Sequence, residues 1–211
     1  MSRETMKHPG LNLGSLHGAD HDAAENMMFG FWVFLMSDAI LFGMVFASYV
    51  TSVNATAGGP GPHDLYGITS VFIETMVLLA SSFTFGMASL AMKYRHSERR
   101  LVAWLLVTLL LGLAFIGVEL HDFASMAAKG GVPTRSGFLS AFFDLVPLHG
   151  LHVAAGCLWM IALLVQLARY GVDTKAKLGI MRLALFWHFL DIIWIGIFSV
   201  VYLPGCMHAV G

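Results

Sequence analysis

The chain contains five long apolar stretches, and each of them carries at least one ionisable side chain. Each stretch is long enough for a helix that crosses a bilayer, whose hydrocarbon core of about 30 Å needs about 20 apolar residues. Ionisable side chains are rare at that depth and usually face a protein interior rather than lipid. The pattern therefore predicts an all-α membrane protein in which five transmembrane helices pack as a bundle around polar groups.

Turn-forming and charged segments separate the apolar stretches. The sequence GGPGP at 58–62 and the charged sequence KYRHSERR at 93–100 both interrupt the hydrophobic pattern. We expect a polar tail over 1–26, one transmembrane domain over 27–205 and a short tail over 206–211. The predicted spans are 27–50, 69–92, 101–124, 141–168 and 181–203.

Composition excludes several other classes of protein. The chain is 57% hydrophobic and only 12% charged, whereas about 25% charged residues is typical of soluble domains. A net charge of −1 gives no basic surface for nucleic acid. Cys157 and Cys206 form no recognisable metal or disulfide pattern. The first 26 residues are polar, so we expect no cleavable signal peptide.

The distribution of Lys and Arg predicts the orientation in the membrane. Of the 12 Lys and Arg residues, ten lie in the segments 3–7, 93–100 and 169–182, which all fall on one side of a five-helix bundle. Positively charged loops remain in the cytoplasm. We therefore expect a cytoplasmic N-terminus and a periplasmic C-terminus.

The ionisable residues of the spans are the candidate functional residues. At a rise of about 1.5 Å per residue they fall into two levels. We expect Asp38, His188 and Asp191 to form a layer near the middle of the membrane. A second layer about 10 Å further out is expected to hold Glu74, Glu119, His149 and His152. Within it we expect His152 on the side of the central layer, and we expect Asp122 nearer the outer surface.

Three of these pairs are spaced three residues apart, which places both members on one helix face. They are Glu119 with Asp122, His149 with His152, and His188 with Asp191. We expect each pair to point at a single neighbouring helix. We also expect His149 or His152 to contact Glu74 or Glu119.

Small residues spaced four apart favour close helix contacts in membranes. Gly43 with Ala47 and Gly150 with Ala154 have this spacing. The aromatic residues of the first and last spans are typical of interface belts and bundle packing.

Three interpretations of the polar interior remain open from the residues alone. Histidines with nearby carboxylates could bind a metal or haem, but the symmetric Glu-x-x-His pattern of di-iron bundles does not occur. Chains of acidic groups and histidines also form proton or ion paths. The third interpretation is structural, with polar groups joining the helices. His8, His17 and His21 are interpreted as part of a solvated tail.

Four segments in this order resemble subunit III of the haem-copper terminal oxidases. They are FGFWVFLMSDAILFGMVFASYV (29–50), ETMVLLASS (74–82), HGLHVAAG (149–156) and FWHFLDIIWIGIFSVVYL (186–203). The sequences SGFLSAFFDLVPLHGLHV (136–153) and NATAGGPGP (54–62) look most like the bo-type ubiquinol oxidase branch of the family.

The resemblance implies a non-catalytic subunit 3 of a proton-pumping oxidase in the bacterial inner membrane. The complex oxidises ubiquinol and reduces oxygen to water. Haems, copper and ubiquinol are then expected in subunit I, with subunits II and IV as further partners. Phospholipids would occupy a V-shaped cleft, and this chain would bind no metal or cofactor and carry no catalytic residue.

The resemblance also extends to single residues. Asp38 stands where the cytochrome c oxidase members have a buried Glu, and Glu119 and Asp122 stand where they tend to have Gln and Glu. Among the remaining candidates, four match the family motif directly: His149, His152, His188 and Asp191. The alternatives are an accessory subunit of a nitric oxide reductase, an autonomous ion transporter and a haem protein.

Overall fold

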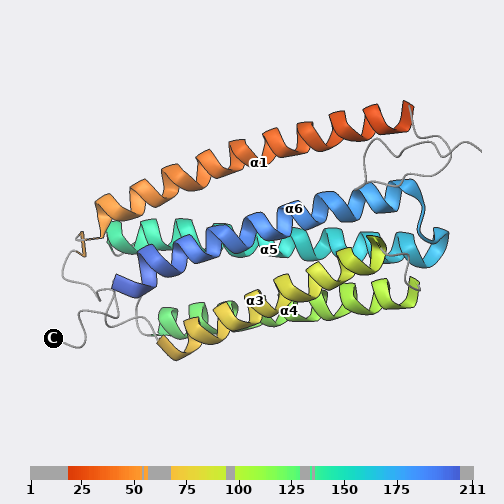
Figure 1. The fold of residues 1–211 in the computed structure, drawn as a ribbon. Helices are drawn as coiled ribbons and strands as arrows, with labels where there is room; N and C mark the ends of the chain where they lie inside the picture. Colours follow the sequence, from red (N-terminus) through yellow and green to blue (C-terminus); the bar gives the residue numbers. More distant parts are fainter. Residues whose placement is uncertain are drawn as a thin grey trace, which may run out of the picture.

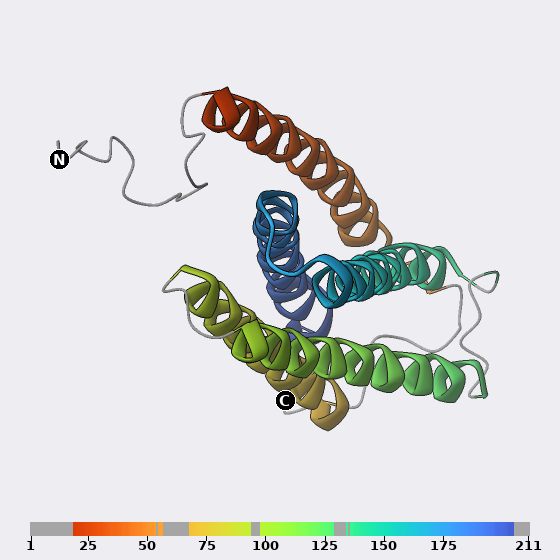
Figure 2. The ribbon, with the colours of Figure 1, turned by 90° about the vertical axis from the view of Figure 1, so that its right-hand side faces the viewer.

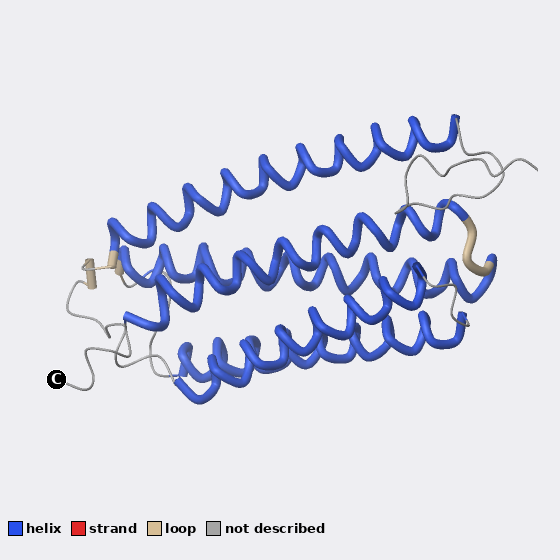
Figure 3. Tube along the Cα trace, viewed as in Figure 1, coloured by secondary structure: helices blue, strands red, loops and turns tan. Residues whose placement is uncertain are grey.

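The computed structural model describes residues 19–53, 55–56, 68–93, 98–128, 134 and 136–204. Within these ranges the regular structure is helical throughout (Figure 3). The elements are α1 (Ala19–Ser52), α3 (Ile68–Lys93), α4 (Glu98–Ala128), α5 (Gly137–Tyr170), α6 (Thr174–Ile197) and the π-helical turn η2 (Phe198–Tyr202).

The five predicted spans are confirmed as five helices that are long and apolar enough to cross a membrane. The helices are longer than predicted, however. The span expected over 101–124 belongs to a helix of 31 residues, Glu98–Ala128, and α1 begins at Ala19, inside the segment expected to be a tail. Apolar composition marks only the hydrocarbon crossing, whereas a helix continues through the headgroup region with polar side chains.

The connection between α5 and α6 is short because both helix ends are capped. Gly171 adopts a positive φ of 70° and its N–H donates to the carbonyl of Leu167, a common way to end a helix. The Asp173 carboxylate then accepts from the N–H of Ala176 at 2.6 Å, which caps the start of α6. This tight turn makes α5 and α6 antiparallel neighbours.

The α5–α6 pair forms the centre of the bundle (Figure 1). On one side it packs against the closely associated pair α3 and α4, and on the other side it packs against α1. Figure 2 shows the same arrangement along the helices, with α1 set apart from α3 and α4. Successive helices alternate in direction, so the start of α1 and the α3–α4 and α5–α6 connections lie at one end.

The first helix is the peripheral one. Only 11% of the residues in its most apolar stretch are buried, against 33% to 44% in the other spans. Its contacts with α5 include Phe31 against Trp159 and Tyr49 against Phe138, with ring centroids 5.7 and 6.0 Å apart. A few specific contacts therefore hold α1 to the rest of the bundle.

Small residues allow the central helices to approach closely, although only partly where the sequence predicted. A Cβ at Gly43 would have nothing within 4 Å, so the expected role of Gly43 in a close contact is wrong. Gly112 of α4 and Gly156 of α5 instead lie against the indole of Trp187, which is 1% exposed. The large buried ring requires glycine on both neighbouring helices.

The last span changes its helical register near its end. The π-helical turn η2 accommodates one additional residue in the helix, a feature that is often found at functional sites. The turn buries Tyr202, whose ring packs on Phe142 and Trp194. The register change thereby brings a phenol into the bundle interior.

The tight contact at Gly112 generates a stability prediction. A Cβ there would lie 2.8 Å from the Trp187 ring, so we expect Gly112→Ala to lower the free energy of unfolding by about 1–3 kcal/mol through overpacking. Gly117→Ala on the same helix is the matched control, because a Cβ at Gly117 meets nothing within 4 Å. Thermal unfolding of the purified protein measures both, and equal midpoints would contradict the prediction.

Candidate functional site: the polar interior

A carboxylate–imidazole pair joins the peripheral helix α1 to the central helix α5. Asp38 Oδ2 lies 3.3 Å from His152 Nε2, and the two side chains are 11% and 20% exposed. The His152 ring also packs beside Phe42 of α1 and Phe186 of α6. The two side chains are therefore largely enclosed by protein. Their contact is a close approach rather than a well-aligned hydrogen bond, because Asp38 Oδ2 has no hydrogen-bond partner among the described residues.

The other ring nitrogen of His152 bonds to its own helix. Nδ1 lies 2.7 Å from the carbonyl oxygen of Leu148, and because a carbonyl only accepts, Nδ1 must be the protonated donor. This bond fixes the orientation of the ring, so that Nε2 faces the carboxyl group of Asp38.

A second polar group joins α6 to α3 at the same depth. His188 Nδ1 lies 3.3 Å from Asp191 Oδ2 and 3.0 Å from Ser82 Oγ. Phe85 lies against the imidazole edge. His188 therefore faces α3 through Ser82 and also contacts Asp191 in its own helix; that both side chains face one neighbouring helix stays a prediction.

A group of acids lies near the other end of the spans. Glu74 of α3 is 2% exposed and Glu119 of α4 is 4% exposed. Glu74 interacts electrostatically with both Glu119 and Asp122, and Tyr202 interacts with all three. Ser70 Oγ donates to the Asp122 carboxylate at the rim of this group. Asp122 therefore bonds to α3 through Ser70.

Gly150 provides the space that Glu119 occupies. A Cβ at Gly150 would lie 2.6 Å from Glu119 Oε1 and 2.8 Å from its carboxyl carbon, closer than any real side chain could approach. The carboxylate of α4 therefore lies directly against the backbone of α5. The expected close contact at Gly150 is confirmed, although the partner is a carboxylate rather than a small residue.

His149 is fully buried, and neither ring nitrogen has a hydrogen-bond partner among the described residues. Its ring lies between Phe115 and Trp194, with centroids 5.9 and 5.3 Å away. The Oε1 atom of Glu119 also lacks a hydrogen-bond partner in this part of the chain. No hydrogen bond therefore joins His149 to Glu119 Oε1, and the expected contact of His149 or His152 with Glu74 or Glu119 stays a prediction.

The residues predicted for the central layer do not all contact one another. Asp38 contacts His152, whereas His188 contacts Asp191. His149 and His152 do not point at a single neighbouring helix, because His152 contacts Asp38 of α1 and Phe186 of α6. His149 packs against α4 and α6. Positions three apart differ by about 60° around a helix, which suffices to reach different helices from the centre of a bundle.

Hydroxyl groups make interhelical contacts that the sequence reasoning missed. Trp187 Nε1 donates to Ser81 at 3.0 Å and Trp194 Nε1 donates to Thr75 at 3.1 Å, which joins α6 to α3. Thr84 and Thr108 join α3 to α4 at 2.8 Å. The available signal was the presence of Ser and Thr inside apolar spans, where hydroxyls commonly bond across helices.

No group of three or more His, Cys, Asp or Glu side chains among the described residues is arranged to hold a metal ion. Cys157 is buried with a free thiol, and Cys206 lies outside the described residues, as do His8 and His17. Several polar contacts cross between helices, such as Asp38 with His152 and Ser82 with His188. Such contacts can join helices.

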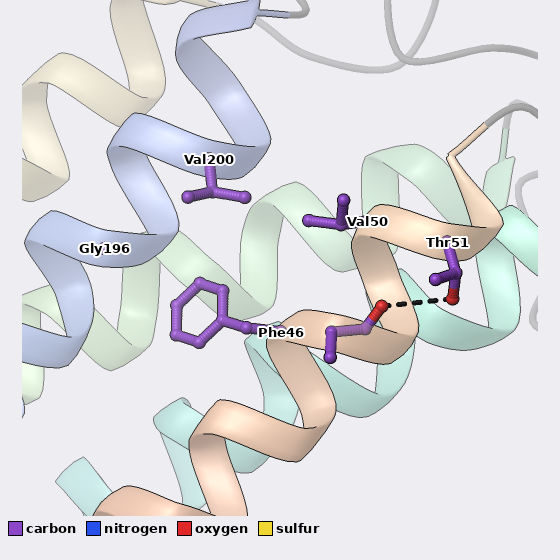
Figure 4. Close-up of a pocket in the computed structure, with 6 residues that line it drawn as sticks. Phe46, Val50, Thr51, Gly196 and Val200 are labelled. Carbon is purple, nitrogen blue, oxygen red and sulfur yellow. Dashed lines mark hydrogen bonds between the residues drawn. The ribbon is translucent and has the colours of Figure 1, made fainter.

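An open apolar groove of about 490 Å³ lies between α1 and the end of the last span. Figure 4 shows Phe46, Val50 and Thr51 of α1 on one wall, with Gly196 and Val200 opposite. The Thr51 hydroxyl is satisfied by the carbonyl of Ala47 in its own helix. The groove therefore offers apolar surface without a free hydroxyl at Thr51.

This fold and interior define a multi-span helical membrane protein whose polar groups connect its helices. A scan against family models matches cytochrome c oxidase subunit III over residues 11–206, and the chain belongs to this family.

Individual relatives agree with the family match. The chain is 48% identical to cytochrome bo(3) ubiquinol oxidase subunit 3 of Pseudomonas aeruginosa, over 92% of this chain and 93% of that protein. It is 42% identical to quinol oxidase subunit 3 of Bacillus subtilis, over 83% and 86%. It is 39% identical to cytochrome c oxidase subunit 3 of Bacillus sp. PS3, over 86% and 87%.

The pair formed by Asp38 and His152 generates a double-mutant prediction. We expect Asp38→Ala or His152→Ala alone to lower the free energy of unfolding by about 3–5 kcal/mol, because each leaves a buried polar partner unpaired. The double variant should cost less than the two single losses together, by about 0.5–3 kcal/mol. Thermal unfolding measures the series, with Ser37→Ala on the exposed face of α1 as the control. Strict additivity would show that the two groups do not interact.

Proposed function

We propose that this chain is a non-catalytic subunit 3 of a terminal oxidase that oxidises ubiquinol and reduces oxygen to water. The observation that carries the proposal is the 48% identity to a bo(3) ubiquinol oxidase subunit 3 along nearly the whole of both chains. A second such relative, from Pseudomonas putida, is 46% identical over 89% of this chain. The proposal assigns to this chain the role that the names of these relatives describe.

The role proposed for the chain within this complex is structural. Its polar groups are engaged in contacts between helices, such as Asp38 with His152 and Ser82 with His188. The oxidoreductase chemistry, with haems, copper and ubiquinol, is assigned to subunit I. Subunits II and IV are the further proposed partners.

We also propose an orientation and a location. The antiparallel helices bring the basic ends of α3, α4, α5 and α6 to the same end of the bundle. That end is assigned to the cytoplasm by the positive-inside rule, in the inner membrane of a bacterium. The acids Glu74, Glu119 and Asp122 then lie on the periplasmic half.

The open groove between α1 and α6 is proposed as a site for a phospholipid acyl chain. Its lining is almost wholly apolar, and its position along two membrane-spanning helices gives a chain of methylene groups direct access. Burial of each methylene group contributes about 0.8 kcal/mol. Acyl chains bound there would fill the space between the peripheral helix and the bundle.

The subunit assignment is tested by affinity purification of the tagged chain from membranes in mild detergent. We expect copurification with a larger haem-containing subunit, and a visible spectrum with haem bands that disappears when the chain is isolated from its partners. A Soret band that stays with the isolated chain would identify a haem protein instead. Purification of the intact chain without any haem-containing partner would contradict the proposal.

The lipid proposal is tested by filling the groove. We expect Ala47→Trp, which places a large ring against Gly196 and Val200, to reduce the number of phospholipids retained by the purified complex, as counted by native mass spectrometry. Ala155→Trp, at an exposed position on α5 away from the groove, is the matched control. An unchanged lipid count in Ala47→Trp would show that the groove holds no lipid.

A further inference from the structure

The imidazole of His188 is exposed on the surface of the bundle, at the middle of a membrane span. The last span runs from Lys175 to Tyr202, so His188 is 13 residues from one end and 14 from the other. Its side chain is nevertheless 47% exposed. Polar groups at this depth are costly in lipid and normally face protein or a water-filled cavity.

Hydrogen bonds within the chain satisfy only part of this group. Ser82 and Asp191 both approach Nδ1 of the ring, and Nε2 has no hydrogen-bond partner among the described residues. Asp191 Oδ1 is buried without a partner in the same part of the chain. Lipid tails can supply no donor or acceptor to either atom.

The surface around His188 is otherwise apolar and follows the helix. Leu185, Ile192 and Ile195 are 37%, 67% and 50% exposed, and their spacing from His188 places them on its face of α6. Leu79 adds an exposed apolar side chain from α3, one turn before Ser82. The result is an apolar stripe with one polar group at its centre, the form that a helix-to-helix contact takes in membranes.

We propose that this stripe of α6, together with the adjoining edge of α3, is the docking surface for a membrane-spanning helix of a partner subunit. The partner helix places a hydrogen-bonding side chain opposite His188 Nε2 at mid-membrane depth. The inference rests on the proposed function, since it requires the chain to be a subunit of a complex. It goes further by locating the contact and naming its central group.

The opposite face of the central pair provides a matched comparison. Leu151 of α5 is 66% exposed, almost the same as Ile192. It lies within a few residues of the middle of its span, Gly137–Tyr170. Ala155 and Leu158, which are exposed nearby towards one end of the helix, are apolar, and Asp144, two turns away towards the other end, is exposed and acidic. Exposure and depth are therefore similar at Ile192 and Leu151, but only the surface around Ile192 carries a polar side chain near the middle of its span.

The test is photo-crosslinking in membranes that contain the whole complex, with benzoylphenylalanine at Ile192 or at Leu151. We expect the probe at Ile192 to form an adduct with a different polypeptide of the complex and the probe at Leu151 to form adducts mainly with lipid. Adducts of the Ile192 probe with lipid alone, or with a second copy of this chain, would overturn the proposal.

Variants of the polar group supply a second measurement. We expect His188→Leu to reduce the partner subunit retained in detergent by about three- to tenfold, the loss of one interhelical hydrogen bond, while His188→Gln retains more. The amount of each variant in the membrane shows whether it folds. Equal retention in both variants would refute a hydrogen bond at this position.

Failure of this inference differs from failure of the proposed function. If the unaltered chain copurifies with a haem-containing subunit but the Ile192 probe reaches only lipid, the docking surface is wrong and the proposed function stands. If the probe reaches a polypeptide that belongs to no oxidase, the docking surface stands and the proposed function is wrong.

Discussion

The contact between Asp38 and His152 is the interaction on which the attachment of α1 depends. A smaller share of the residues of this helix is buried than in the other four. Because lipid tails are as apolar as its own side chains, hydrophobic burial contributes little to its attachment to the bundle. The carboxyl group of Asp38 and the imidazole of His152, 3.3 Å apart, do contribute to its attachment, because separating the two helices would leave both polar groups in hydrocarbon. The helix is held in place by the free-energy cost of exposing these two polar groups to lipid, rather than by the strength of the contact between them.

The central position of α5 follows from the same constraint. His152 is turned towards α1, while His149 and Gly150 lie against α4 and α6. One short segment therefore serves three neighbouring helices, and its glycine allows the Glu119 carboxylate to lie on the helix backbone. A larger residue at 150 would move α4 and α5 apart, along with the acids that α4 carries.

The sequence predicted the helices well and the contacts between them less well. Apolar length and charged breaks located all five spans, because hydrocarbon thickness leaves little choice. Depth along each span was also informative, but it could not reveal which helix a side chain faces. The contact of Asp38 with His152 and the packing of His149 between Phe115 and Trp194 were therefore not predicted, since both depend on the rotation of α1 and α5 within the bundle. The hydroxyls of Ser81, Ser82 and Thr75 were overlooked, although each lies inside an apolar span.

Two histidines, His149 and His188, have ring nitrogens without a hydrogen-bond partner among the described residues. Their different positions give these unpaired nitrogens different effects. His149 is fully enclosed by this chain, so no partner protein can reach it, and the cost of its unpaired nitrogens falls on the stability of the bundle itself. The side chain of His188 is 47% exposed, so a second protein can remove its cost by supplying a hydrogen bond. An unpaired imidazole nitrogen in the interior therefore lowers the stability of the bundle. An unpaired imidazole nitrogen at the surface favours binding of another membrane helix, because that helix can supply the missing hydrogen bond.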